Sequence, residues 1–562
     1  MAVTDLNLNF VLPALGVVAA TGVAYFIATA YRHRSHINQW HKQGFPMLAG
    51  WSWLAGHTLV LLRYSSRFPP LANVALVLQA MLEEYPESEM FLIDLWPAMP
   101  PVIVNCNPDV AMLVSQKYNL PKSSTVEQAI EPIVGGPSIL TMNGSDWKTW
   151  RSRFNPGFSA ASLMGHVPYI VDRVQVFCEK LQASVGRDII SLDDFATRLT
   201  FEIIMKVSLD SDIDYQCGEH PLSTSLNTIT RWHSFWDPRV LLHPLRPFIQ
   251  WYHGNIIKNY IRKELEQRFS ELKAERLESE TVAKKANSVI ALALEAYISE
   301  SEDKRILERP RLNDEFAETV SHQIRLFLLA GNDTTASTIV FMYHLLSKHP
   351  EARVPLRAEH DAIFGKDISN AATLLKQQPA LLNQCRYTLA VIKETLRMYP
   401  PAPTMRQGLP GYSITTLDGV SLPTEHVRIM TNTWAVQKNP RLWVRPEEFL
   451  PERWLANSGD ELYPIPGAYR PFDLGPRVCL GQTLSLNELR VVLIMTARSF
   501  KLEPAYEEWD SMQAKNAGLW TKVTTWIGGK EIDTVKGDRA FQTEVAGSHP
   551  SDGYPCRVSL AV

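Results

Sequence analysis

The sequence has no excess of basic side chains. Its 56 Lys and Arg residues are matched by 59 Asp and Glu residues, so the formal net charge is -3. Proteins that bind nucleic acid present a strongly basic surface to the phosphate backbone. This balance of charge therefore argues against nucleic acid as a partner.

Cysteines are few and widely spaced. No two of them form a CxxC pair, so a zinc site built from close cysteine pairs is unsupported. So sparse a set is also unlike the disulfide framework of a secreted protein, and we expect a reducing compartment. The six cysteines are Cys106, Cys178, Cys217, Cys385, Cys479 and Cys556.

Linkers rich in Pro, Gly or Ser are also missing, and we find no internal repeat. The 562 residues are 45% hydrophobic, which suits a large core. We expect one large domain with appendages, mainly α-helical with a small β portion. The clearest helix follows Asn313, a good N-cap, and ends before Pro350. A short β-hairpin is expected within residues 412–436.

A long uncharged segment lies near the N-terminus. Residues 10–31 contain no charged side chain. At about 1.5 Å per residue, a helix of this length crosses a hydrocarbon core of about 30 Å. Arg32 and Arg34 follow directly, and the positive-inside rule places that end in the cytosol.

We therefore predict three parts of the chain: a short luminal N-terminus over residues 1–9, a transmembrane signal-anchor helix over residues 10–31, and a cytosolic domain over residues 32–562. A cleaved signal peptide is the alternative, because residues 28–30, Ala-Thr-Ala, have the small side chains of a cleavage site.

The most specific signal is a loop near the C-terminal end, Pro-Phe-Asp-Leu-Gly-Pro-Arg-Val-Cys-Leu-Gly at residues 471–481. A cysteine thiolate is a soft metal ligand. Gly475 and Gly481 remove side chains on either side of Cys479, so the backbone can approach a flat cofactor. A helical pattern follows from about Gln482, and its N-terminal N–H groups would stabilise the negative charge of the sulfur. The alternative is a buried structural cysteine beside a turn.

Two further side chains of this loop suit a cofactor that carries carboxylates. Arg477 is placed to bind such a carboxylate, and Phe472 can shield the sulfur from water. The complete pattern F-x-x-G-x-R-x-C-x-G resembles the haem-thiolate signature of the cytochrome P450 family. The resemblance implies a cytochrome P450 fold, haem b as cofactor, and iron bound through the thiolate of Cys479.

Two more motifs resemble structural parts of that family. Glu394 and Arg397 match its E-x-x-R pair and share one face of a helix. Residues 449–454, Phe-Leu-Pro-Glu-Arg-Trp, are similar to its P-E-R-F segment, with Trp454 in place of Phe. The resemblance implies that Glu394, Arg397 and Arg453 form a buried triad that locks the region of the cysteine loop.

A third motif lies in the long helix. Residues 330–335, Ala-Gly-Asn-Asp-Thr-Thr, resemble the family's A-G-x-D-T-T. Gly331 leaves room for a planar cofactor or dioxygen, and an acid next to a hydroxyl can relay protons through water. We therefore assign Asp333 and Thr334 a catalytic role in proton delivery. The alternative is a helix with a polar kink.

Other positions are expected at the haem carboxylates. Trp147 and Arg151 match the family's W-x-x-x-R on one helical face, and Arg406 is a further candidate. Two positions depart from the family. Ser485 stands where alanine is common, and Gln437 stands where a histidine is common, which weakens one expected contact with a haem carboxylate.

The resemblance implies a monooxygenase that uses O₂ and takes electrons from NADPH through a separate NADPH–cytochrome P450 reductase. It would hydroxylate, epoxidise or desaturate a hydrophobic small molecule, as a single-pass protein of the endoplasmic reticulum membrane with a cytosolic catalytic domain. Residues 399–408 and 539–557 resemble filamentous-fungal members of the sterigmatocystin and aflatoxin type. This implies a mycotoxin or another secondary metabolite, such as a polyketide or terpenoid.

Two alternatives to this function stay open. One is a member of the family that rearranges or dehydrates its substrate without O₂, and the other is a non-catalytic haem-binding membrane protein. Substrate contacts are expected in variable segments whose side chains are mostly apolar or aromatic, although each can instead belong to the packed core. They are residues 123–140, 231–239 and 402–405, with Phe327, Ala330 and Phe541.

Overall fold

A computed structural model describes residues 8–235, 237–278, 288–300, 310–516, 532–545 and 547–561. The prediction of a mainly helical chain with a small β portion is confirmed. The α-helices are α1 (Leu8–Lys42), α2 (Thr58–Ser65), α3 (Val74–Leu82), α4 (Pro108–Met112), α5 (Ser124–Val134), α6 (Gly144–Phe154), α7 (Ala160–Gly165), α8 (Val167–Ser184), α9 (Leu192–Leu209), α10 (Pro221–Arg231), α11 (Pro238–Leu241), α12 (Arg246–Glu278), α13 (Val289–Ser299), α14 (Asp314–Lys348), α15 (Arg353–Phe364), α16 (Asn370–Gln377), α17 (Arg386–Met398), α18 (Thr433–Lys438), α19 (Gln482–Thr496) and α20 (Tyr506–Asn516). The strands are β1 (Met90–Ile93), β2 (Val102–Asn105), β3 (Ile190–Ser191), β4 (Thr404–Gln407), β5 (Ser413–Thr415), β6 (Ser421–Pro423), β7 (Arg428–Thr431), β8 (Phe500–Pro504) and β9 (Pro555–Leu560).

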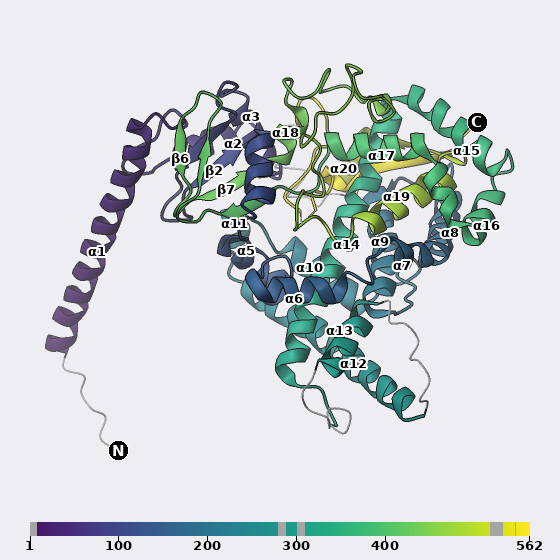
Figure 1. Ribbon diagram of the computed structural model, residues 1–562, viewed down its shortest axis with the longest axis horizontal. Coiled ribbons are helices and arrows are strands. Elements are labelled where there is room, and N and C mark those ends of the chain that lie inside the picture. The colour runs from purple at the N-terminus through teal and green to yellow at the C-terminus, as the bar shows by residue number, and fades with distance from the viewer. Residues whose placement is uncertain are drawn as a thin grey trace.

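The described strands form three small sheets. The largest has the order β1-β2-β7-β4, in which β2 and β7 are parallel and the other neighbours are antiparallel. β5 and β6 form the predicted hairpin, whose turn contains Gly419 at a φ of 89°. The third sheet has the order β3-β9-β8. Figure 1 shows β2, β6 and β7 at one side of the helical body, next to α1.

The long helix predicted after Asn313 is α14, which runs through the middle of the helical body (Figure 1). The Asn313 side chain caps it by accepting a hydrogen bond from the N–H of Phe316, and the helix ends at Lys348, before Pro350. It packs along α9, α17 and α19. A Cβ at Gly331 would lie 2.5 Å from Cδ1 of Ile204 in α9, so the close approach of α9 gives this glycine a packing role in addition to the one expected.

The N-terminal helix α1 is longer than the uncharged run from which the anchor was predicted. Among the described residues, its segment Leu15–Lys42 is long and apolar enough to cross a membrane. The last turns of α1 instead pack on the folded body, where Arg34, Ile37 and Trp40 are buried. These three residues are spaced three apart, so they lie on one side of the helix. This side contacts the folded domain beyond the end of the apolar run.

Candidate active site

The predicted cysteine loop leads directly into α19. It is folded back on itself by hydrogen bonds from the N–H of Cys479 to Phe472 O (2.9 Å) and from the N–H of Val478 to Gly475 O (3.0 Å). Gly475 has a φ of 87°, and a Cβ there would lie 2.7 Å from the carbonyl oxygen of Ser115. Only glycine fits this position without strain, so the close contact with the backbone of Ser115 holds the loop in place.

The thiol of Cys479 faces a cavity of about 310 Å³ inside the protein. Cys479 is accessible from this cavity. Desolvation by the surrounding protein raises the pKa of the thiol, while the N–H groups of Gly481 and Gln482 and the positive charge of Arg151 act in the opposite direction. These N–H groups belong to the start of α19, as expected from the sequence. They would stabilise a thiolate bound to a metal ion.

The cavity collects most of the residues predicted at the site. Helix α14 forms the part of its wall that contains Ala330, Gly331, Thr334 and Thr335. The hydroxyl of Thr335 lies 3.1 Å from that of Ser485, the serine that replaces the usual alanine. The predicted residues that line the cavity are Trp147, Arg151, Thr334, Phe472, Arg477, Cys479 and Gly481.

Positive charge gathers beside the cysteine loop. Nη2 of Arg406 donates to Asp473 at 2.8 Å, and Nη2 of Arg470 donates to the same carboxylate at 3.1 Å. Arg477 and Lys122 line the cavity next to them. Burial lowers the pKa of Arg477 to about 10 and that of Lys122 to about 7, and the charge of Arg406 acts in the same direction on both.

The cationic cluster, which comprises Lys122, Arg406, Arg470 and Arg477, carries more positive than negative charge. Within the described part of the chain, Nε of Arg406 and Nη1 of Arg470 are buried and have no hydrogen-bond partner. Buried cations are stable only when they are paired. A cofactor with two carboxylates supplies the missing charge, and the thiol of Cys479 supplies a ligand for its iron. The residues therefore fit haem, held between α14 and the cysteine loop.

The two residues assigned to proton delivery point to different places. Thr334 lines the cavity, and its hydroxyl donates to the carbonyl oxygen of Ala330 at 2.8 Å. Asp333 is not among the lining residues. Its carboxylate accepts hydrogen bonds from His549, at 2.8 Å, and from the N–H of Gly547. The expected acid and hydroxyl are therefore not assembled in the cavity in this conformation.

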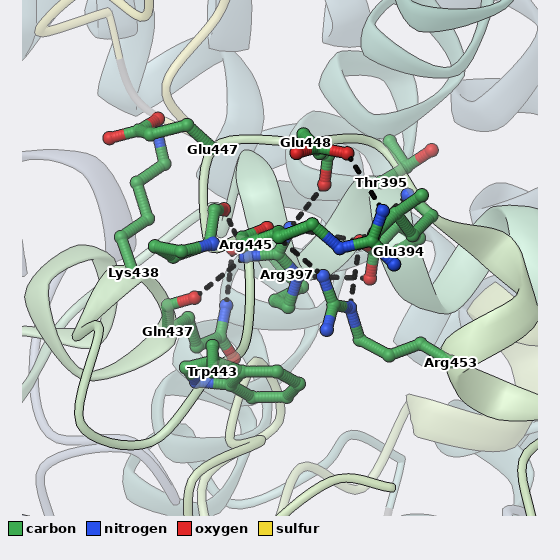
Figure 2. Close-up of polar contacts among 12 residues, drawn as sticks. Glu394, Thr395, Arg397, Gln437, Lys438, Trp443, Arg445, Glu447, Glu448 and Arg453 are labelled. Carbon is green, nitrogen blue, oxygen red and sulfur yellow. Dashed lines mark hydrogen bonds and ion pairs between the residues drawn. The ribbon is translucent and has the colours of Figure 1, made fainter. Parts of the chain in front are cut away.

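The triad expected from the sequence is confirmed. Figure 2 shows Arg397 and Arg453 converging on Glu394, with N–O distances of 2.8 and 3.2 Å. All three side chains are fully buried. Arg397 also donates to the carbonyl oxygens of Gln437 (2.9 Å) and Glu448 (3.0 Å). The triad therefore ties α17 to the segment that leads to the cysteine loop.

Gln437, which replaces the usual histidine, connects this triad to the cationic cluster. Its amide nitrogen donates to Leu396 O and Arg397 O, both at 2.9 Å. Its amide oxygen accepts from the N–H of Arg470 at 2.9 Å. Gln437 thus positions Arg470 through the backbone and does not itself line the cavity.

Sequence reasoning missed four residues of this region, namely Lys122, Arg470, Asp473 and His549. Asp473 lies inside the recognised loop and Arg470 directly before it, and their positions before Gly475 were a signal that could have been weighed. Lys122 and His549 had no local signal, because each reaches the site through a contact that is distant in sequence: Lys122 approaches Thr404 at 3.4 Å, and His549 approaches α14.

The cavity wall includes only part of the segments expected to contact substrate. Ile139, Leu140, Phe327, Ala330 and residues 402–404 line it. Neither Phe541 nor the described residues of 231–239 do so; Trp236 of that segment lies outside the described residues. Phe541 is buried in the protein instead, at 5% exposure.

Comparison with known proteins gives a consistent result. The sequence model of the family described as Cytochrome P450 matches residues 76–525. Cytochrome P450 monooxygenase polC of Polytolypa hystricis is 36% identical over 558 residues, which cover 97% of this chain and 95% of that relative. Cytochrome P450 monooxygenase acrF of Aspergillus aculeatus is 30% identical, covering 84% and 94%. Human cytochrome P450 4Z1 is 27% identical, covering 71% and 76%.

Proposed function

The chain belongs to the cytochrome P450 family and resembles its monooxygenases, and from this membership we propose that it uses O₂ and electrons from a separate NADPH–cytochrome P450 reductase to oxygenate a hydrophobic small molecule. The observation that carries the proposal is the Cys479 thiol, which faces a mainly apolar cavity whose wall also holds Thr334. When bound there, haem supplies the oxygen chemistry, and thiolate ligation favours O–O cleavage.

The chain's own residues have separate tasks in this proposal. Cys479 holds the iron, while Arg151, Arg406, Arg477 and Lys122 hold the carboxylates of the cofactor. Trp147 stacks under the guanidinium of Arg477, at 4.5 Å, and so fixes that cation at the cavity. Thr334 and Asp333 deliver protons. The apolar side chains of the wall exclude water and orient the substrate.

We further propose that residues 10–31 anchor the protein in the endoplasmic reticulum membrane, with residues 1–9 luminal and the catalytic domain cytosolic. The apolar, uncovered surface of α1 supports the anchor. For the substrate we propose a fungal secondary metabolite, a polyketide or terpenoid that is hydroxylated, epoxidised or desaturated. Similarity to monooxygenases of two fungi, over 97% and 84% of this chain, supports a fungal setting.

The test uses the full chain with haem bound, in detergent, together with NADPH–cytochrome P450 reductase. We expect a thiolate-type carbon monoxide spectrum in the reduced protein. With an anthraquinone and a triterpenoid as probes, we expect NADPH-dependent products that carry one atom from ¹⁸O₂ after hydroxylation or epoxidation, or that have lost two hydrogen atoms after desaturation. Product formation without NADPH would instead identify an enzyme that rearranges its substrate, and neither product nor NADPH consumption would identify a non-catalytic haem protein.

The ligand assignment has its own control. Cys479→Ala should abolish the thiolate-type spectrum, whereas Cys217→Ala, which removes an exposed cysteine, should leave it intact. An unchanged spectrum in Cys479→Ala would mean that another side chain binds the iron.

A further inference from the structure

The carboxylate of Asp333 is held by a C-terminal segment of the chain, residues 547–549. Nε2 of His549 lies 2.8 Å from Oδ1 of Asp333, and the N–H of Gly547 donates to Oδ2. Nδ1 of the same imidazole lies 2.6 Å from Oδ1 of Asp193, in the first turn of α9. Both oxygens of Asp333 are thus engaged, and one histidine bridges two carboxylates.

The segment is fitted closely against α14. A Cβ at Gly547 would lie 2.6 Å from Oδ2 of Asp333 and 3.0 Å from the backbone nitrogen of Thr334. One turn further along α14, the hydroxyl of Ser337 donates to the carbonyl oxygen of Ser548 at 2.9 Å. Only a glycine allows the chain to pass so near to Asp333, so the contact is built into the fold.

The charges around the imidazole are of one sign. Asp193 faces it from α9 and Asp333 faces it from α14, whereas Asn73, Ser337 and Thr543, which bond the segment from other sides, are uncharged. His549 is 6% exposed. An imidazole donates to two carboxylates at once only when both of its nitrogens carry a proton.

Charge and burial act against each other at this site. Burial alone would lower the pKa of His549, but the charges of Asp193 and Asp333 and the hydrogen bonds to them outweigh it and raise the pKa well above the usual value. The raised pKa therefore favours the doubly protonated form that the geometry requires.

We propose that His549 is a positioning residue for Asp333: as an imidazolium bridged to Asp193, it holds the carboxylate outside the cavity. Asp333 then serves in proton delivery only when it leaves His549 and turns toward Thr334. The inference rests on the proposed monooxygenase function and assigns to it a residue from outside the recognised motifs.

The first test measures the pH profile of coupling, defined as product formed per NADPH consumed. We expect the alkaline limb of the profile to report the loss of the bridging proton from His549, whose pKa is raised, and to be absent in His549→Gln. His549→Lys keeps a cation and should retain the wild-type coupling at neutral pH.

A matched control separates charge from packing. Ser337→Ala removes a hydrogen bond to the same segment without changing any charge, so its profile should match that of the wild type. The proposal is overturned if the alkaline limb persists in His549→Gln, or if Ser337→Ala removes it equally. The reduced carbon monoxide spectrum shows that each variant is folded and holds haem.

A second test needs no turnover. The folded-state pKa of His549 lies above the unfolded value of about 6.5, so its contribution to stability is complete below pH 6.5 and is lost as the pH rises through the folded pKa. The difference in urea midpoint between wild type and His549→Gln should therefore shrink at high pH. If the wild type lacks NADPH-dependent oxygenation, the proposed function fails, yet this test still decides whether the bridge exists.

Discussion

The indole nitrogen of Trp454 donates a hydrogen bond of 3.0 Å to Oε2 of Glu394, the central carboxylate of the buried triad. Glu394 is fully buried and is already bound by Arg397 and Arg453. Phenylalanine, the usual residue of the family at this position, has no donor. In this chain Trp454 thus adds a charge-assisted hydrogen bond to the buried triad, which supports the region of the cysteine loop.

Replacing Trp454 with Phe should therefore lower the free energy of unfolding by about 1–2 kcal/mol, somewhat below the usual value for a hydrogen bond to a charged group. The loss is moderated because Oε2 keeps its bond from Nε of Arg397 at 2.9 Å. Urea unfolding followed by far-ultraviolet circular dichroism measures the change. Trp53→Phe makes the same substitution at an exposed site and should have no effect. Equal midpoints for both variants would show that the hydrogen bond contributes nothing.

Local sequence signals predicted much of the fold and of the site. The cysteine loop and the capped helix α14 depend on neighbours within a few residues, so their spacing was enough to predict them. The cationic cluster was predicted only in part. The pairing of Arg406 with Asp473 depends on the packing of β4 against the loop, and the two residues are distant in sequence. The contact between His549 and Asp333 spans 216 positions, and no local pattern marks it.

Thr334 should be required for coupling of NADPH use to product formation. Its hydroxyl is on the cavity wall in α14, where it can order water for proton delivery. Thr334→Ala should lower product per NADPH by about tenfold or more, a part of the ~10²–10⁴-fold that general acid–base catalysis contributes, and raise hydrogen peroxide. Thr338→Ala is the matched control, because that hydroxyl donates to Thr334 O at 2.8 Å but does not line the cavity. Fully coupled turnover in Thr334→Ala would remove this role.

Acid should destabilise the protein through His57. Nδ1 of this buried imidazole accepts a hydrogen bond from the N–H of Asp94 (2.9 Å), and the other nitrogen donates to Leu48 O (3.1 Å). Burial lowers its pKa from 6.5 to about 4. Between these two values the unfolded state binds the proton more tightly, so the contribution of His57 is complete above pH 6.5 and falls by up to about 3 kcal/mol toward pH 4.

The check compares urea midpoints between pH 7 and pH 4. His57→Gln should be less stable than the wild type at pH 7, and the gap should narrow as the pH falls. His426→Gln, which replaces a histidine with 76% of its side chain exposed, should follow the wild-type curve. A gap that stays constant with pH would show that His57 does not titrate between the folded and unfolded states.

The junction between α1 and the folded domain depends on a buried ion pair. Arg34 pairs with Asp94 and donates to the carbonyl oxygen of Trp96 at 2.9 Å. Asp94 is completely buried, and contacts with His33, Trp51 and Arg34 overcome burial and lower its pKa to about 2. A chain that begins at residue 32 keeps this pair. We expect such a chain to match the full-length protein in stability.

A chain that begins at residue 43 loses Arg34 and leaves Asp94 without its cation. Breaking a buried pair in this way costs about 3–5 kcal/mol, and urea unfolding should show a loss of that order relative to the chain that begins at residue 32.

The packing of Ile37 and Trp40 is lost as well, so Asp94→Asn separates the two effects. In the longer chain the substitution should destabilise, because Arg34 is left unpaired. In the shorter chain it should stabilise, because it removes an unpaired charge. The same sign in both chains would mean that the ion pair does not hold α1 to the domain.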